Sequence, residues 1–397
     1  MSKEKILLAL SGGLDTTFCA VYLDRERNFE VHSAIVNTGG FSPEELTRIG
    51  SHARKLGVVD HQVLDITADY YNRCLRYMIF GNVLRNRSYP LSVSSERTFQ
   101  AIALVEYARA RGFKYLAHGS TAAGNDQVRF DLVFQVLAPE MEVVTPIRDL
   151  KISREDEIRY LKEKGIEMSW ERVEYSINQG LWGTSVGGKE TLTSGEELPE
   201  KAYPVNMERS GTEMVTIGFE QGEPVQLNGQ AFEPLVVIRE LEELAAPWGI
   251  GRDVHVGDTI IGIKGRVGVQ AAAARMIIEA HLALEKHVLT RWQLHWKEQI
   301  GQWYGMFVHE AQYLEPVMRD LEKFLESTQQ NVTGEVRLRM RPYTFSVAGV
   351  ESPFDLMSAQ FASYGEMNRL WTAEEVDGFT RILGNQQRIW HEINRKE

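Results

Sequence analysis

Short apolar runs alternate with helix-like stretches over the first 165 residues, and this alternation constrains the fold more than any other feature. The runs that we expect to be strands are Lys5–Leu10, Val31–Val36, His61–Ile66 and Tyr115–His118. Strands that alternate with helices form βαβ units, in which helices cover both faces of a parallel sheet. The sequence therefore predicts an α/β domain built on a parallel sheet in this part of the chain.

Two of the intervening helices have ends that the sequence marks. Ser42, Pro43 and Glu45 form the pattern of an N-cap, a first-turn proline and a capping-box glutamate, and Gly57 marks the end of that helix. Ser153 begins a second helix, which has an acidic first turn, a basic last turn and a glycine just beyond it. These signals are typical of helices that connect parallel strands.

The pattern changes after about residue 166, where strands and helices no longer alternate regularly. The expected elements there are a loop over Gly187–Glu213, a hairpin of Met214–Phe219 and Pro224–Leu227, a helix over Pro234–Ala246, a strand over Val254–Ile263, helices over Ala271–Lys286 and Arg291–Leu325, strands over Val336–Arg341 and Tyr343–Val350, and a helical region that Thr372 caps. We therefore expect an α/β domain over residues 1–165, a second, α+β domain over 166–370, and a C-terminal helical arm over 371–397.

The charge and the cysteine content exclude several classes of protein. The 397 residues include 44 Lys and Arg against 55 Asp and Glu, a formal net charge of −11, which weighs against a broad nucleic-acid surface. Cys19 and Cys74 are too few for a disulfide scaffold or a cysteine-rich metal site, and we expect Cys19 to lie in an inert core. The longest N-terminal apolar run, Ile6–Leu10, is too short to cross a membrane, so we expect a soluble cytoplasmic protein.

The segment Ser11–Thr17, with the sequence S-G-G-L-D-T-T, follows the first predicted strand directly. Its two glycines let backbone N–H groups approach an anion, its hydroxyl groups add donors, and the N-terminus of the next helix favours negative charge. Asp15 would repel a bare phosphate, so we expect a magnesium ion or a fixed loop amide as its partner. The alternative is a glycine turn that only joins strand to helix, but a chance match to S-G-G-x-D-T is roughly one in a thousand. The string matches neither the P-loop nor the dinucleotide-binding motif.

A second polar loop, residues 118–130, follows the fourth predicted strand, and open α/β sheets bind ligands at this end of their strands. Thr121, Asn125, Asp126 and Arg129 offer a hydroxyl, an amide, a carboxylate and a guanidinium within nine positions. This set can hold a zwitterionic amino acid, with Arg129 on its carboxylate and Asp126 on its ammonium. A polar loop that caps a helix through Asn125 or Asp126 explains the same residues equally well. The chemistry of the loop alone leaves both interpretations open.

The S-G-G-x-D-T string resembles the pyrophosphate loop of the N-type ATP pyrophosphatases, which have an adenine nucleotide alpha hydrolase-like fold and split ATP into AMP and pyrophosphate. Amidating members fit poorly, because no cysteine follows Met1 and no part of the chain resembles a glutaminase module. Members that thiolate tRNA fit poorly as well, because they need catalytic cysteines and a basic surface. Another adenylating enzyme of this superfamily and a non-catalytic module on the same fold remain as alternatives.

Residues 118–130 discriminate among the members of this superfamily. Their sequence resembles the motif G-x-T-G-K-G-N-D-Q-V-R-F of the argininosuccinate synthase family, with Ala122-Ala123 in place of the Gly-Lys pair. Further segments match that family in order: Tyr89–Ser94 (Y-P-L-G-T-S in the family) followed by Arg97, then Tyr175–Ile177, Leu181–Gly188 and Gly262–Arg266 (G-I-K-S-R in the family). The likeness covers nearly the whole chain.

The resemblance implies a ligase that condenses citrulline with aspartate and gives argininosuccinate in arginine biosynthesis. ATP would be cleaved to AMP and pyrophosphate through a citrullyl-adenylate, with Mg²⁺ present but no metal site built by the protein alone, and with no general base. The resemblance also implies a homotetramer. The ATP contacts that it implies are Ala9, Leu10, Ser11, Gly12, Gly13, Leu14, Asp15, Thr16, Thr17, Val36 and Gly119. The implied aspartate contacts are Thr121, Asn125 and Asp126, and the implied citrulline contacts are Tyr89, Ser94, Asn125, Arg129, Ser176 and Ser185.

Two positions depart from the family pattern on the citrulline side of the site. The family has a glutamate and a tyrosine where this chain has Gly257 and Val269. Asp258 and Gln270, each one residue further along, are the candidates to replace them. A modified citrulline is therefore a conceivable substrate.

An aromatic stripe and a lone histidine motif are interpreted as structural. Trp292, Trp296 and Trp303 recur at near-helical spacing with Phe307, which favours a buried core or a subunit interface over a ligand-binding group. His309 lacks the second histidine of a zinc-protease motif. Neither feature is expected to take part in the chemistry.

Overall fold

The computed structural model describes residues 3–122, 124–166, 175–357 and 370–395. The chain forms two compact units, Met1–Pro353 and Phe354–Glu397, which are described separately below. The boundary that we expect at residue 165 falls inside the first unit.

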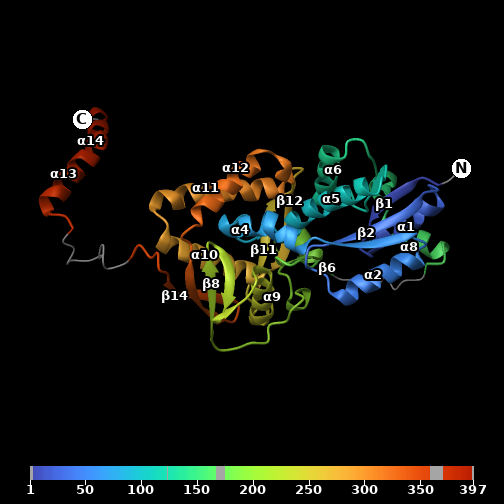
Figure 1. Ribbon diagram of the computed structural model, residues 1–397, viewed down its shortest axis with the longest axis horizontal. Helices are drawn as coiled ribbons and strands as arrows, with labels where there is room; N and C mark the ends of the chain where they lie inside the picture. Colours follow the sequence, from blue (N-terminus) through green and yellow to red (C-terminus); the bar gives the residue numbers. More distant parts are fainter. Residues whose placement is uncertain (1–2, 123, 167–174, 358–369, 396–397) are drawn as a thin grey trace. The chain divides into compact units, whose positions relative to one another are not determined.

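A five-stranded parallel sheet forms the core of the N-terminal part (Figure 1). Its strand order is β3-β2-β1-β4-β5, and its strands are β1 (Lys5–Ala9), β2 (Glu30–Asn37), β3 (Asp60–Asp65), β4 (Tyr115–Ala117) and β5 (Glu142–Val144). The four strands expected from the sequence are confirmed. The edge strand β5 was not predicted, because its three residues are too few to show a periodic pattern.

Helices cover both faces of this sheet, as the pattern of β1 requires. Ile6 and Leu8 pack with α1 (Leu14–Arg25), whereas Leu7 on the opposite face packs with α5 (Ser92–Ala110). All three side chains are buried, because successive strand residues face opposite sides of a sheet that is covered twice. The remaining helices of this part are α2 (Pro43–Lys55), α6 (Asn125–Leu137), α7 (Pro146–Leu150) and α8 (Arg154–Glu163).

The helix ends follow the signals in the sequence. The Ser42 side chain accepts a hydrogen bond from the Glu45 N–H, and the Glu45 carboxylate accepts one from the Ser42 N–H, so the capping box is confirmed. Ser153 caps α8 through the N–H of Asp156. Cys19 is fully buried, as expected, and burial raises the pKa of its thiol.

One helical region gave no usable signal in the sequence. It consists of α3 (Thr67–Tyr70), the π-helix η1 (Tyr71–Leu75), α4 (Arg76–Phe80) and α5. Buried residues occur all around α5, polar ones such as Ser95 and Thr98 included, so no single apolar stripe marks the helix.

A five-stranded antiparallel sheet follows, with the order β10-β9-β8-β13-β14. Its strands are β8 (Glu213–Glu220), β9 (Glu223–Leu227), β10 (Gln230–Ala231), β13 (Gly334–Arg341) and β14 (Thr344–Glu351), which confirms both predicted strand pairs. The helices α9 (Pro234–Ala245) and α10 (Ala272–Val288) are confirmed, and their apolar faces share one core with this sheet.

A smaller antiparallel sheet has the order β11-β12-β7-β6. It comprises β6 (Ser176–Asn178), β7 (Thr184–Gly187), β11 (Arg252–Asp258) and β12 (Lys264–Gln270). The prediction of one strand over Val254–Ile263 is wrong. The chain reverses there in a turn that ends at Gly262, whose φ of +81° favours glycine, and it returns as β12. The predicted loop over Gly187–Glu213 begins at the end of β7 and contains two short 3-10 helices, η2 (Lys189–Leu192) and η3 (Glu200–Ala202).

The predicted continuous helix over Arg291–Leu325 is also wrong. The structure has α11 (Arg291–His309), the 3-10 turn η5 (Gln312–Leu314) and α12 (Val317–Thr328). Ala311 adopts a left-handed φ of +60° and Pro316 precedes α12, so the helix cannot continue through this segment.

The aromatic stripe on α11 does not form a buried core within the chain. Trp292, Trp296 and Trp303 are 61%, 55% and 58% exposed, whereas Phe307 is partly buried against the main core. Of the two structural interpretations, the core is therefore excluded for the three tryptophans, and the subunit interface stays a prediction.

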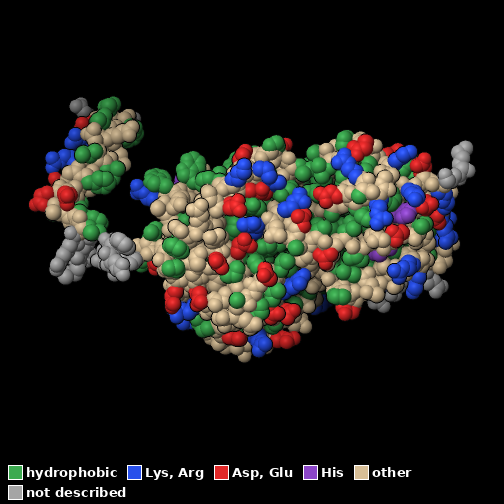
Figure 2. Space-filling model, viewed as in Figure 1, with side chains coloured by type: hydrophobic (Ala, Val, Ile, Leu, Met, Phe, Trp, Pro, Cys, Tyr) green, Lys and Arg blue, Asp and Glu red, His purple; other side chains and the backbone are tan. Residues whose placement is uncertain are grey.

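The second unit contains α13 (Ala373–Leu383) and α14 (Asn385–Ile393). Thr372 caps α13 with Glu375 in a capping box, which confirms that signal. The described residues of this unit include no buried side chain on either helix, and Figure 2 shows apolar side chains on their surface.

None of the helices in the described parts of the chain is both long enough and apolar enough to cross a membrane.

Close packing of α11 on the turn after α4 leads to a stability prediction. A Cβ on Gly301 would come within 2.2 Å of the Gly81 carbonyl oxygen, which is backbone and cannot move aside. Although alanine favours a helix by about 1 kcal/mol over glycine, overpacking costs about 1–3 kcal/mol, so Gly301→Ala should lower the thermal unfolding midpoint. Gly378→Ala, in α13 with no atom outside the helix's own backbone within 4 Å, is the matched control and should not lower the midpoint. An unchanged midpoint for Gly301→Ala would contradict the contact.

Candidate active site

A cavity of about 1160 Å³ lies at the carboxyl ends of β1, β2 and β4. Both polar loops predicted from the sequence border it, together with residues of β6, β7 and the β11–β12 hairpin. The structure thus brings into one cavity segments that are up to about 300 positions apart in the chain, from Ala9 to His309.

The phosphate loop presents donors to this cavity. Gly12 has a φ of +79°, and Gly13 is the N-cap of α1 without a side-chain cap, so the first N–H groups of the helix face the loop. Ser11 Oγ and Thr16 Oγ1 lie 3.3 Å apart and border the cavity. Thr17 is instead fully buried, with its hydroxyl 2.9 Å from His52 Nε2, and neither it nor Gly12 lines the cavity.

The two loops contact each other at Gly119. A Cβ there would lie 3.2 Å from the carbonyl carbon of Asp15 and from Thr16 Cγ2. A glycine at this position therefore lets the end of β4 approach the N-terminus of α1. Ala9, Leu10, Leu14 and Val36, which were also predicted to contact the nucleotide, line the same part of the cavity.

Asp15 is hydrogen-bonded to Glu157 of α8, a residue that the sequence did not suggest. Burial raises the pKa of both groups, and the negative charge of Asp15 helps to raise that of Glu157 to about 8. The nearby Arg154 guanidinium lowers both pKa values. The pair therefore retains a proton to a higher pH than two exposed carboxyl groups would.

The second loop is organised by an ion-pair network. Asp126 Oδ2 accepts from Arg97 Nε at 3.1 Å, and Asp126 Oδ1 accepts from Arg129 Nη1 at 3.0 Å. Arg129 is only 3% exposed, and its Nη2 also donates to Ser94 Oγ at 3.0 Å and to the His309 carbonyl oxygen at 3.2 Å. Burial raises the pKa of Asp126, but the two guanidinium groups lower it more, so it lies below its ordinary value.

This network changes the interpretation of the loop. The sequence favoured Arg129 on a substrate carboxylate and Asp126 on a substrate ammonium as separate contacts. In the structure each is already the partner of the other, although both border the cavity. Asn125 Oδ1 accepts from the Ile260 N–H at 2.9 Å, which joins the loop to the β11–β12 turn. Thr121 lines the cavity and is exposed.

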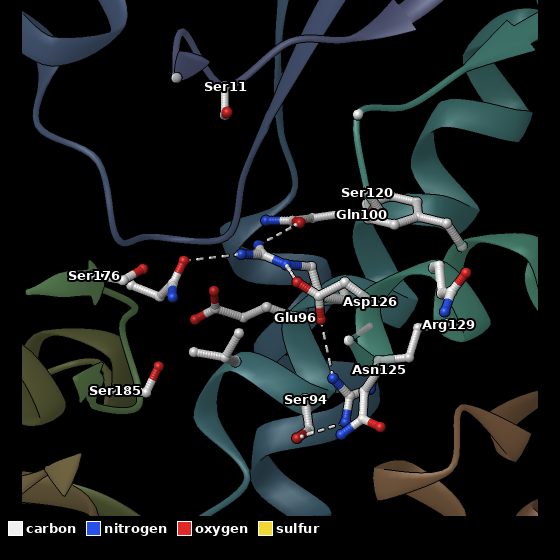
Figure 3. Close-up of a pocket in the computed structure, with 18 of the residues that line it drawn as sticks. Ser11, Ser94, Glu96, Gln100, Ser120, Asn125, Asp126, Arg129, Ser176 and Ser185 are labelled. Atoms are coloured by element: carbon white, nitrogen blue, oxygen red, sulfur yellow. Dashed lines mark hydrogen bonds and ion pairs between the residues drawn. The ribbon is translucent and has the colours of Figure 1, made fainter. Parts of the chain in front are cut away.

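The residues predicted to contact citrulline lie together on one side of the cavity. Tyr89 and Ser94 are buried, with their hydroxyl oxygens 3.4 Å apart, and Ser176 and Ser185 come from the paired strands β6 and β7. Figure 3 shows Ser94, Ser176 and Ser185 on the same side of the arginine network. All four residues line the cavity.

The two departures from the family pattern have different structural outcomes. Gly257 lines the cavity, and a Cβ there would come within 2.6 Å of His255 Nε2, whose ring packs against Tyr89 at 5.1 Å. Val269 is fully buried in the core. The chain therefore presents no side chain at the first position and an apolar, buried one at the second.

The two candidate replacements also differ. Asp258 lies at the edge of the cavity, where it forms a 2.7 Å ion pair with Lys264. Gln270 is 1% exposed and hydrogen-bonds the backbone of Val205 at 3.3 Å, away from the residues that line the cavity. Gln270 is thus not positioned to contact a ligand there.

Other residues border the cavity without having been singled out for it. His309 accepts a hydrogen bond from Arg129 through its carbonyl oxygen, and it also lines the cavity. Glu96, Gln100 and Arg154 line it as well. Glu96 could have been noticed because it is a charged residue next to Arg97, in a helix whose other residues are mostly buried.

Comparison with known proteins agrees with this geometry. The model of the arginosuccinate synthase N-terminal HUP domain matches residues 5–167, and that of the arginosuccinate synthase C-terminal domain matches residues 175–390. The chain belongs to the argininosuccinate synthase family. It is 36% identical over 393 residues to the argininosuccinate synthase of Dictyoglomus thermophilum and 35% identical over 393 residues to that of Methanocaldococcus jannaschii, with 98% of each chain covered. It is 35% identical over 407 residues to that of Xanthomonas campestris pv. campestris, with both chains covered completely.

Family membership explains why two loops far apart in sequence border one cavity. Argininosuccinate synthases are ATP-using ligases, and a ligase must hold its nucleotide beside the groups that it joins. The parallel sheet supplies the phosphate loop, and the later sheet supplies the opposite wall with Ser176 and Ser185.

The Asp15–Glu157 pair leads to a prediction for the pH dependence of stability. In the unfolded chain a glutamate loses its proton near pH 4.5, whereas folded Glu157 retains it to about pH 8. The folded state then binds the additional proton between these pH values, so this residue makes the protein less stable as the pH rises through that window. In Glu157→Gln this loss is absent, and the variant should gain stability relative to wild type between about pH 5 and pH 8.

Urea unfolding across that pH range measures the effect. Glu155→Gln, an exposed position on the same helix, is the control and should follow the wild-type curve. A Glu157→Gln curve parallel to wild type would show that the pair does not share a proton.

Proposed function

We propose that this protein condenses citrulline with aspartate to give argininosuccinate, at the cost of cleaving ATP to AMP and pyrophosphate. The observation that carries the proposal is the shared cavity, where the phosphate loop and the Asn125–Arg129 segment meet. Its volume of about 1160 Å³ exceeds the range of about 300–1,000 Å³ typical of single-ligand pockets, as three substrates require. Membership of the argininosuccinate synthase family supports the same reaction.

In the first step, the ureido oxygen of citrulline attacks the α-phosphorus of ATP, and pyrophosphate leaves. The N–H groups of the phosphate loop, with the Ser11 and Thr16 hydroxyls, would receive the leaving charge. The oxygen atoms at this loop, those of Asp15 among them, suit a magnesium ion that travels with ATP. Such an ion would neutralise charge on the phosphates.

In the second step, the amine of aspartate attacks the citrullyl-adenylate carbon, a carbon–nitrogen bond forms, and AMP leaves with the oxygen. The amine releases a proton in this step. No side chain is assigned as general base. The catalysis is attributed to the site holding the two reactants together in the orientation that they need to react. The Arg97–Asp126–Arg129 network would keep the two amino-acid sites in a fixed relation.

The binding roles follow the positions that match the family. ATP would contact Ala9–Thr17, Val36 and Gly119, with Gly12 and Thr17 acting through the loop conformation. Aspartate would contact Thr121, Asn125 and Asp126. Citrulline would contact Tyr89, Ser94, Asn125, Arg129, Ser176 and Ser185, so that Asn125 would contact both amino acids.

Assembly and location belong to the same proposal. We infer a homotetramer in the cytoplasm, divided into a nucleotide-binding domain, a substrate domain and a C-terminal arm over residues 371–397. Exposed apolar residues of α11, α13 and α14, such as Trp296, Phe379 and Ile382, support an assembly that covers them.

The reaction is tested by pyrophosphate release from purified protein with every combination of ATP, citrulline and aspartate. Full turnover should require all three substrates, because only aspartate can react with the citrullyl-adenylate and release AMP. Turnover that does not depend on citrulline would refute the proposal. Adenylation that continues without aspartate would show that the protein activates citrulline but does not ligate it.

Arg129 offers a direct test of the citrulline side. Arg129→Ala removes a buried guanidinium that binds Ser94, Asp126 and the His309 carbonyl oxygen. The lost charge-assisted hydrogen bonds should raise the KM for citrulline about 10- to 100-fold. Arg109→Ala, an exposed ion-pair residue on α5, is the control and should leave the kinetics unchanged. An unaltered citrulline KM and kcat in Arg129→Ala would contradict the assigned role.

A further inference from the structure

Five carboxylate side chains line the cavity, and four of them already have a partner. Asp15 is bound by Glu157, and Glu45 accepts from the Ser42 N–H. Both oxygens of Asp126 are taken by arginines, and Asp258 is paired with Lys264. The fifth is Glu96 of α5, whose carboxylate is not in an ion pair with any residue that the structure describes.

Glu96 is held in place by its surroundings. The residue is 3% exposed, and its Oε1 has no hydrogen-bond partner within the described part of the chain. The backbone of Gly180 packs directly on it, since a Cβ at Gly180 would lie 2.0 Å from Glu96 Oε1. A glycine is therefore needed beside this carboxylate, because Oε1 is buried against the backbone at that position.

The adjacent arginine does not neutralise Glu96 by a hydrogen bond. Arg97 Nε donates to Asp126, its Nη1 donates to Gln100 at 2.9 Å, and its Nη2 lies 3.5 Å from Asn178 Oδ1. Burial raises the pKa of Glu96 to about 7, and this effect exceeds the lowering by the charge of Arg97 and by hydrogen bonding with Thr38 and the Leu181 backbone. A carboxylate buried in this way is costly unless a cationic group pairs with it.

The direction of Glu96 selects the ligand group. Figure 3 shows its side chain extending toward β6 and β7, which carry Ser176 and Ser185, and away from the start of α6. ATP is anionic, and the magnesium ion that travels with it would lie at the phosphate loop, on its phosphates. The cations that the proposed substrates bring are the α-ammonium groups of citrulline and aspartate, and the citrulline side is the one that Glu96 faces.

We propose that Glu96 binds the α-ammonium group of the amino acid that is adenylated, and so makes a free α-amino group a requirement for that substrate. This inference rests on the proposed function. Glu96 acts as a binding residue, in charge-assisted contact with the substrate and remote from the ureido oxygen that reacts. Asp126 is left to hold the two arginines in place.

The experiment compares Glu96→Gln with wild type in the pyrophosphate-release assay. The variant keeps the shape of the side chain but loses its charge, so the KM for citrulline should rise about 10- to 100-fold while kcat changes little. The KM values for aspartate and ATP should stay as in wild type. Glu106→Gln, an exposed position on the same helix, is the matched control and should have wild-type kinetics.

A second arm uses citrulline acetylated on its α-amino group, which carries no cation. Wild type should use it at least about 10-fold less efficiently than citrulline, whereas Glu96→Gln should discriminate far less between the two compounds. This arm measures wild type as well, so equal use of the two compounds by wild type would refute the inference even if the variant does not fold.

Three outcomes would overturn the inference. They are an unchanged citrulline KM in folded Glu96→Gln, a rise confined to the KM for aspartate, and wild-type use of acetylated citrulline that equals or exceeds that of citrulline. In each case pyrophosphate release by wild type still depends on a citrulline compound and aspartate, so the proposed function stands. Loss of that dependence altogether would refute the proposed function and this inference with it.

Discussion

The ion pairs that Asp126 makes with Arg97 and Arg129 are the interaction on which the rest of the site depends. Asp126 begins α6, whereas Arg97 belongs to α5, so the pair fixes the two helices that cover one face of the parallel sheet. Arg129 extends the connection to the end of α11 through the His309 carbonyl oxygen. A buried guanidinium needs several acceptors at once, and the fork geometry of arginine satisfies them in fixed directions. The wall between the two proposed amino-acid sites is therefore rigid before any substrate arrives.

Positively charged side chains lie beside the acidic ones in this cavity, which the net charge of the whole chain does not reveal. The net charge of −11 describes a surface with an excess of acidic groups, yet the cavity has Arg97, Arg129 and Arg154 among its lining residues. Neighbouring side chains affect the titration of two of its carboxylates. Asp15 lies beside Glu157, whose pKa is raised, and Asp126 is paired with arginines. Low local dielectric makes each of these pairings stronger than at the surface, so anionic phosphates and zwitterionic amino acids can share one space.

Much of the fold followed from local signals, and the failures have physical causes. Capping boxes at Ser42 and Thr372 are local contacts, so the helices that they begin were predicted correctly. The reversal between β11 and β12 was missed, because the β-branched residues Thr259, Ile260, Ile261 and Ile263 favour a strand through the turn. The break after α11 was missed because apolar spacing continues across Ala311, whose left-handed conformation depends on its packing.

The sequence by itself determined the chemistry that is available: a glycine-rich phosphate loop after a strand, and an amide, a carboxylate and a guanidinium within five positions of a second loop. Those patterns are local, and backbone geometry over a few residues is enough to specify them. Only the tertiary structure decided which groups stay free. It commits Asp126 to two arginines, directs Gln270 away from the cavity, buries Glu157 beside Asp15 and leaves Glu96 without a cation. These outcomes depend on contacts between helices and strands that are distant in the chain, and no short segment of sequence carries that information.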